Sequence, residues 1–319
     1  MTVGSYLLRR LAAIPLTLLG ASLLVFATTV VLPGNVARTI LGREASDASV
    51  AVLNAQLGLD RPLPAQYLSW LAGFLTGDWG TSATLRAPVR DLVLDRLGAS
   101  MLVAGLAFVV LVPVALALGL LAGIHHDRWP DRLISGMALG LGATPEFVTG
   151  VVLLVVFAAT LRWFPVSARP TPGAGPLDML WHLTLPVVCL VLLCCGYVAR
   201  HVRASTVAVL ASPYVRAARL RGMPVGRLVR THVLRNATVP ATSALGVQLQ
   251  FLLGGLVVVE LLFDYPGIGA LLLRSAMDKD LPTLQASAMV LGAAYMLIVL
   301  AADLVYRLLD PRLRLGGTW

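Results

Sequence analysis

Six long apolar segments constrain the fold of this chain more than any other feature of its sequence. They cover residues 11–32, 98–124, 133–161, 181–198, 237–263 and 283–304. An apolar helix of about 20 residues crosses the roughly 30 Å of hydrocarbon in a bilayer. A helix also satisfies its backbone hydrogen bonds within one segment, as lipid requires. We therefore expect an all-α integral membrane protein with six transmembrane helices in one transmembrane domain over residues 1–319.

The composition supports a membrane location and argues against nucleic-acid binding. Of the residues 58% are apolar and 13% are charged, and the mean hydropathy is +0.83. Soluble domains carry about 25% charged residues. The net charge of +9 is concentrated in the polar segments between apolar runs, where topology and lipid head groups account for it. We expect membrane lipid, and no nucleic acid, as a partner.

The polar segments differ in character. Residues 33–97 form the longest one, and an apolar face at helical spacing over 67–75 predicts a helix that lies at the lipid interface or packs on the bundle. Adjacent His125 and His126 lie in a short loop, which we interpret as solvated rather than metal-binding, because no third ligand is evident.

Several kinds of chemistry lack their sequence signals. The three cysteines, Cys189, Cys194 and Cys195, fall in one apolar run without metal-ligand spacing, so we interpret them as buried small residues. The chain has no GxxxxGK[ST], HExxH or GxSxG motif, and therefore no expected ATP, zinc or serine-hydrolase site. These absences disfavour an intramembrane protease. A secondary transporter is a second alternative, but its inverted repeats and several intramembrane charges are not found.

The most basic polar segment covers residues 200–236. Its part from Pro213 to Pro240 reads PYVRAARLRGMPVGRLVRTHVLRNATVP and contains six arginines and no acid. Residues 214–220 favour a short helix, and Gly222 can turn a helix end at positive φ. Pro224 suits the first turn of a new helix. The pattern therefore predicts a helix, a break and a second helix.

This pattern resembles the cytoplasmic EAA loop of permeases in binding-protein-dependent ABC importers. In that family two small residues precede a glycine by five and four positions, as Ala217 and Ala218 precede Gly222 here. Arg216 stands where the general pattern has Glu, so the acidic contact of the family cannot be transferred. The end of the segment, LRNATVP at 234–240, is similar to the dipeptide and oligopeptide branch.

Two more segments carry the same resemblance. LGLDRPLPAQYLSWLAGFLTGDWGTS at 57–82 and YPGIG at 265–269 are similar to external segments of peptide permeases. The chain is thus identified as a member of the dipeptide, oligopeptide and nickel transport family, of the first-permease type. The resemblance implies the type I importer permease fold with a cytoplasmic coupling helix.

The resemblance also implies partners and a function. The residues of the coupling helix that would meet an ATPase subunit are Tyr214, Arg216, Ala217, Ala218 and Gly222. The expected assembly is a heterodimer with a second permease, two ATPase subunits or domains and an extracytoplasmic substrate-binding protein. The ATPase partners would bind ATP and Mg²⁺, and this chain would hold no cofactor and catalyse no reaction. The expected substrates are dipeptides or oligopeptides. Nickel, another metal chelate or heme stays open as the alternative.

Basic residues set the expected orientation. Basic residues are more numerous at the two ends, in loop 125–132 and in 200–235 than on the other side, where most of them fall in the long segment 33–97, to which the rule gives a low weight. We expect a multi-pass protein of the inner or plasma membrane with both termini in the cytoplasm and residues 33–97 outside.

Three polar residues within the apolar segments are candidates for the translocation path. Glu146 lies near the middle of 133–161 after Pro145, which predicts a kink, and Gln248 and Gln250 lie near the centre of 237–263. A central acid costs about 2.5–3.5 kcal/mol on insertion scales and usually faces the bundle interior or a wet cavity. Glu146 either offers a counter-charge to a peptide ammonium group or is protonated and hydrogen-bonded to a neighbouring helix, for example through one of the two glutamines.

Overall fold

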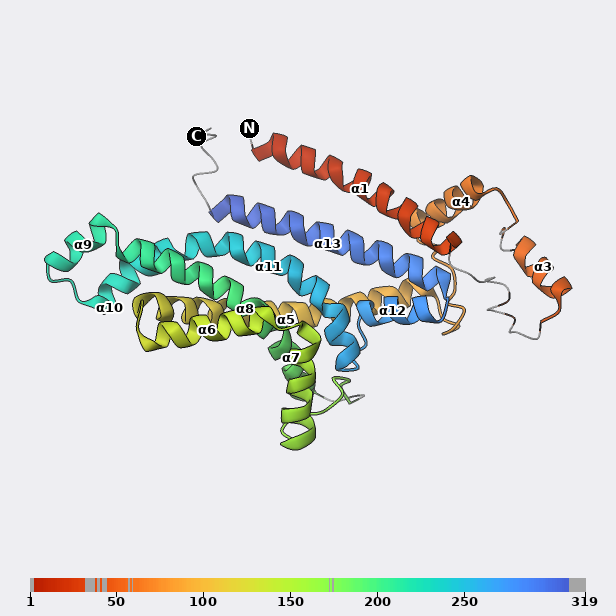
Figure 1. The fold of residues 1–319 in the computed structure, drawn as a ribbon. Coiled ribbons are helices and arrows are strands. Elements are labelled where there is room, and N and C mark those ends of the chain that lie inside the picture. The colour runs from red at the N-terminus through yellow and green to blue at the C-terminus, as the bar shows by residue number, and fades with distance from the viewer. Residues whose placement is uncertain are drawn as a thin grey trace. The chain divides into compact units, whose positions relative to one another are not determined.

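Helices make up almost all of the regular structure in the described part of the chain. The computed structural model describes residues 3–31, 38, 41, 45–56, 58, 60–171, 173 and 175–309. Within them an isolated bridge pairs Thr81 with Pro88, and the remaining regular elements are α-helices or π-helices (η) (Figure 1). The elements are α1 (Val3–Val31), α3 (Asp47–Gln56), α4 (Leu63–Thr76), α5 (Val89–Ile124), α6 (Trp129–Ala143), α7 (Glu146–Leu153), η1 (Leu154–Thr160), α8 (Pro176–Leu210), α9 (Pro213–Leu220), α10 (Val225–Leu228), η2 (Val229–Val233), α11 (Leu234–Leu262), α12 (Ile268–Met277) and α13 (Leu281–Leu309).

The helices form two compact units. The first contains Leu102–Tyr265 and the C-terminal part from Leu297, and the second contains Val3–Met101 and Pro266–Met296. Because α5 and α13 cross these bounds, each contributes to both units. The candidate functional residues all belong to the first unit.

Helix α8 forms the centre of the first unit, where it packs against α6, α7 and α11. Its residues Leu190, Cys194, Val198 and Val202 recur every four positions and are fully buried. The other two cysteines, at 189 and 195, are buried as well, which confirms their interpretation as small interior residues. A helix buried on this scale is apolar on most of its surface, as the sequence of α8 is.

Glycines let α8 approach its neighbours closely. A Cβ atom added to Gly119 on α5 would lie 2.5 Å from Cβ of Val202 and 2.6 Å from the carbonyl oxygen of Ala199. At Gly196 on α8, an added Cβ would lie 2.7 Å from the carbonyl oxygen of Ala138 on α6. Only glycine permits these distances, so the two positions set the spacing of α5 and α6 from α8.

The third expected span is broken rather than kinked. The chain bends by 108° between α6 and the α7–η1 segment, at a break across Thr144 and Pro145. Both residues have extended backbones, with ψ of 129° and 141°. Proline removes a backbone donor and disfavours a helical conformation in the residue before it, which explains the break at this position.

Long apolar helices contain the other expected spans. Val89–Ile124, Pro176–Leu210, Thr242–Leu262 and Leu281–Leu304 are each long and apolar enough to cross a membrane, and the bent pair would add one more. The first expected span lies in α1, whose residues Ala12–Thr28 are apolar and helical. Its end at Leu32, parts of 33–44 and the tail from 310 lie outside the described residues.

The second unit has a separate core. Val89 and Val93 of α5 pack with Ile268 and Leu271 of α12 and with Ala286 of α13. The expected apolar helix over 67–75 is α4, and it packs on α1, because the Tyr67 ring meets Phe26 at a centroid distance of 5.5 Å. In this unit Asp280 is 2% exposed and accepts hydrogen bonds from the Ser82 and Thr283 hydroxyl groups.

Candidate functional site

The basic segment folds into the predicted helix, break and second helix. Ser212 is extended and Pro213 occupies the first turn of α9, where a missing N–H has no cost. Helix α9 ends at Leu220, and α10 begins at Val225, directly after Pro224. Figure 1 shows α9 and α10 together at the end of the first unit where α8 ends.

Gly222 turns the end of α9 with φ of +78°. The Gly222 N–H donates to the Arg219 carbonyl at 2.9 Å, and the Met223 N–H donates to the Ala218 carbonyl at 3.2 Å. This pair of bonds is the Schellman motif, which satisfies the carbonyl groups at a helix end. A Cβ atom on Gly222 would meet nothing within 4 Å. The requirement for glycine is therefore conformational, and the predicted positive φ is confirmed.

One face of α9 packs inside the chain. Val215 is fully buried and Ala218 is 7% exposed, and both pack with the buried side chains of Leu228 and Val233. Residues of two long helices complete this coupling-loop core: Leu120 of α5 and Val209 and Leu210 of α8. Helix α9 is therefore seated on the ends of α5 and α8, and a movement of α9 would be transmitted to both.

The two alanines that were expected to face a partner lie on different faces of α9. Ala218 points into the coupling-loop core, so a larger side chain there would meet this chain before any partner. Ala217 is partly exposed and lies beside exposed Arg216, and Leu220 one turn further on is 85% exposed. Tyr214 is 47% exposed and its ring lies 6.0 Å from that of His232. The outward surface of α9 thus includes Tyr214, Arg216, Ala217, Arg219 and Leu220.

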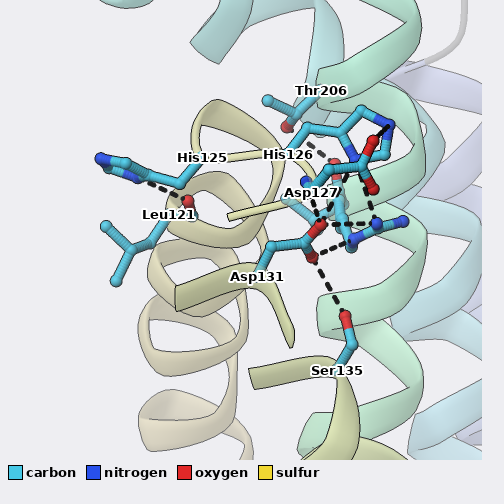
Figure 2. Close-up of polar contacts among 9 residues, drawn as sticks. Leu121, His125, His126, Asp127, Asp131, Ser135 and Thr206 are labelled. Atoms are coloured by element: carbon cyan, nitrogen blue, oxygen red, sulfur yellow. Dashed lines mark hydrogen bonds and ion pairs between the residues drawn. The ribbon is translucent and has the colours of Figure 1, made fainter. Parts of the chain in front are cut away.

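A buried ion pair lies beside this loop, two turns before the end of α8. Asp131 is 2% exposed, and both of its carboxylate oxygens accept hydrogen bonds from the Arg203 guanidinium, one of them from Nη2 at 2.7 Å. The Asp127 N–H and the Ser135 hydroxyl also donate to this carboxylate, at 2.9 and 3.2 Å (Figure 2). The hydrogen bonds from Arg203 hold the pKa of Asp131 well below its usual range, against burial, which raises it. The pair ties the α5–α6 turn to α8.

The same turn brings together three side chains that could bind a metal ion. His126, Asp127 and Asp131 offer ligand atoms within 4.8 Å of one another (Figure 2). The statement that no third ligand lies near the histidines was therefore wrong, because folding brings Asp131 to His126. His125 points away and contacts the Leu121 carbonyl at 3.0 Å. Since Arg203 already occupies both oxygens of Asp131, a cation would have to displace the guanidinium.

The three path candidates occupy different environments. Glu146 begins α7 at the break and is partly exposed, and its Oε2 lies 3.3 Å from the place of a Cβ on Gly255 of α11. Gln248 is 5% exposed and its Nε2 donates to the Cys194 carbonyl of α8 at 3.2 Å. Gln248 therefore joins α11 to α8. Gln250 is partly exposed, as Glu146 is. Glu146 is the one acid among the three candidates, and it lies at the break between helices.

Sequence reasoning missed a buried acid near the end of α11. Glu260 is 1% exposed, and its carbonyl accepts the Tyr265 N–H at 2.8 Å. A single acid within the apolar run VVVELLF was the signal that could have identified it. Asp131 had no comparable signal, because its partner is distant in the sequence.

Known proteins match almost the whole chain. The family described as "Binding-protein-dependent transport system inner membrane component" matches residues 115–315, and its N-terminal counterpart, "Binding-prot-dependent transport system membrane comp, N-term", matches residues 3–102. The glutathione transport system permease proteins GsiC of Salmonella typhimurium (strain LT2) and Escherichia coli (strain K12) are each 36% identical over 310 residues. The alignments cover 97% of this chain and 99% of each relative. A crystal structure of an amino acid ABC transporter with histidines has the same fold, with a TM-score of 0.51, 18% identity and coverage of 70% of this chain and 94% of that chain.

Proposed function

The chain belongs to the family of binding-protein-dependent transport system inner membrane components, and from this premise we propose that α9 couples it to an ATPase subunit during peptide import. The expected class is confirmed: the chain is a membrane-spanning permease subunit of an ABC importer, with an all-α fold and no enzymatic role of its own. Such a subunit works with ATPase and substrate-binding partners.

The observation that carries the coupling role is the construction of α9. Its inner face is anchored on α5 and α8, its end is set by a glycine turn, and its outer face is exposed. A helix of this kind transmits force in both directions between a docked partner and the membrane helices. Closure of the ATPase dimer on ATP would shift α9, and α5 and α8 would follow, so that the permease opens to the outside.

Short peptides are the substrates that we propose. The GsiC relatives are named for the transport of glutathione, which is itself a short peptide. The basic-residue pattern supports both termini and the α9 loop in the cytoplasm. A heterodimer with a second permease follows from the resemblance to the dipeptide and oligopeptide branch.

A matched pair of glycines tests the coupling role. Gly222→Val places a branched side chain at φ of +78°, whereas Gly226→Val alters an exposed glycine of the same loop whose φ is not positive. A left-handed conformation costs a non-glycine residue roughly 1–2 kcal/mol, more for a branched one. We expect Gly222→Val, and Ala217→Trp on the outer face, to insert into the membrane normally. Both variants should lose transport and transport-stimulated ATP hydrolysis together. Gly226→Val should retain both, and normal transport by Gly222→Val and Ala217→Trp would remove α9 from the mechanism.

Glu146 is the residue that we propose to face the substrate path. A carboxylate at a break between helices can meet the ammonium group of a peptide, and irregular backbone at membrane depth is tolerated where it lines a cavity. Glu146→Gln keeps the shape and removes the charge. It should slow transport of peptides with a free amino terminus in proteoliposomes and leave that of N-acetylated peptides, where these are carried, unchanged. Equal rates for both peptide classes, with loss of assembled complex in Glu146→Leu, would instead assign Glu146 to helix packing.

A further inference from the structure

The coupling loop, formed by α9, α10 and η2, exposes a cluster of arginines that have no ion-pair partner among the described residues. They lie on α9, α10 and η2 and at the end of α9, and each is exposed: Arg216, Arg219, Arg221, Arg227 and Arg230. None of the five forms an ion pair with a residue that the structure describes, whereas Arg203, nearby on α8, is paired with Asp131. The sequence contains no Asp or Glu between Asp178 and Glu260. The loop therefore presents a positive surface with no acid of its own segment to neutralise it.

The most exposed large apolar side chain of α9, Leu220, stands among these charges. Leu220 is 85% exposed between Arg219 and Arg221, and Ala217 lies partly exposed one turn earlier. A helix that binds a lipid surface needs a broad apolar face. In α9 the apolar positions Val215 and Ala218 are buried in the coupling-loop core, so the outer face offers Tyr214, Ala217 and Leu220, a narrow strip between arginines. An exposed leucine within a charged rim is instead the form of a protein-binding surface.

From this arrangement we propose that the coupling loop binds an acidic protein surface: a cleft with carboxylates around its rim and an apolar pocket for Leu220. The proposal rests on the proposed coupling function, which makes the partner an ATPase subunit. Complementary charge speeds association and selects between partners. An ATPase whose cleft is basic, and so suited to the Glu of the general family pattern, would be repelled by Arg216. The sign of the charge would thus restrict this permease to ATPases with an acidic cleft.

Salt dependence and charge reversal test the proposal. The full permease assembly in uncharged phosphatidylcholine nanodiscs is titrated with its own purified ATPase subunits. We expect the dissociation constant of the wild type to rise about tenfold between about 0.05 and 0.3 M KCl, because salt screens exposed charges. Arg216→Glu/Arg221→Glu should weaken binding about 100-fold at low salt, and Arg216→Gln/Arg221→Gln about tenfold. Reversing carboxylates to lysines in the ATPase cleft should restore binding to the Glu variant.

The matched control is Arg128→Glu/Arg132→Glu, which reverses two exposed arginines at the neighbouring α5–α6 turn and in the first turn of α6, and should leave binding within about twofold. Salt-independent binding that survives the reversal but is abolished by Leu220→Asp would overturn the acidic partner and leave the coupling role standing. If Arg216→Glu/Arg221→Glu weakened ATPase binding only in phosphatidylglycerol nanodiscs, the arginines would be assigned to lipid. That result would also overturn the acidic partner. Absence of ATPase binding by the intact wild-type assembly at every salt concentration would refute the coupling function itself.

Discussion

Asp131 carries its charge almost out of contact with solvent, and a single guanidinium balances that charge. A buried ion pair of this kind adds little to the stability of a folded chain compared with well-packed apolar side chains in its place. Loss of one partner, however, leaves an uncompensated buried charge. Arg203 is the only described side chain that contacts both carboxylate oxygens, while Ser135 and the Asp127 N–H supply one hydrogen bond each. Substitutions at Asp131 and Arg203 therefore separate the effect of the buried charge from the effect of side-chain packing.

Arg203→Met should destabilise the chain by about 3–5 kcal/mol, because it leaves the Asp131 carboxylate buried and unpaired. Asp131→Asn/Arg203→Met should regain most of this loss, since Asn keeps an oxygen for the Asp127 N–H and carries no charge. Free energies of unfolding in detergent, measured for the wild type, both single variants and the double variant, give the coupling energy. A double variant no more stable than Arg203→Met would show that the cost is lost packing rather than lost charge compensation.

The same pair predicts a pH dependence. The pKa of Asp131 is depressed in the folded chain, so at acid pH the unfolded state binds more protons than the folded state. The contribution of Asp131 to stability is therefore complete above the unfolded pKa of about 4 and is lost as the pH falls from there through the folded pKa. The difference in unfolding midpoint between the wild type and Asp131→Asn should be largest near neutral pH and should shrink below about pH 4.

At the scale of elements, close packing of α5 on α8 connects the membrane helices to the coupling loop. Gly119 and Gly123 of α5 face Val202 and Thr206 of α8, and Leu120 of the same turn reaches the coupling-loop core. The distance between the two helices therefore also determines where α9 is seated.

Gly119→Ala and Gly105→Ala change the same helix and should have opposite effects. At Gly119 an added methyl group meets the Ala199 carbonyl oxygen at 2.6 Å, so α5 must move away from α8, whereas Gly105 has nothing within 4 Å. Alanine in place of glycine favours a helix by about 1 kcal/mol where there is room. We expect a lower midpoint of thermal unfolding and less monodisperse protein for Gly119→Ala, and a small increase in the midpoint for Gly105→Ala. Equal midpoints for the two variants would mean that α5 does not pack this closely on α8.

Local signals predicted most of these elements, and long-range pairing explains what was missed. Gly222, Pro224 and Pro145 act within a few residues, so the turn, the second short helix and an interruption of the third span could be read from the sequence. The size of the 108° bend could not, because it depends on what α7 packs against. The inward direction of Ala218 depends on Leu228 and Val233 in the following elements, and Asp131 meets Arg203 across 72 positions.

At the scale of the whole molecule, the coupling proposal requires one particular orientation in the membrane. The α9 loop must be cytoplasmic to meet an ATPase subunit, and the loop between η1 and α8 must then be external. The distribution of arginines favours this arrangement. The loop between η1 and α8 is attached to the end of α11, where the Ala168 N–H donates to the Phe263 carbonyl at 2.7 Å and Arg169 forms an ion pair with Asp264 at 2.9 Å.

Single-cysteine labelling in intact cells tests this orientation with one position on each loop. Val166 is 61% exposed on the loop before α8, and Gly226 is exposed on the loop after it, so a cysteine at either position can be reached by a membrane-impermeant maleimide. The three native cysteines are buried in α8 and are replaced by alanine as background. We expect Val166→Cys to be labelled in intact cells and Gly226→Cys only after the membrane is permeabilised. The reverse pattern would place α9 outside the cell. It would refute both the coupling role and the acidic ATPase partner.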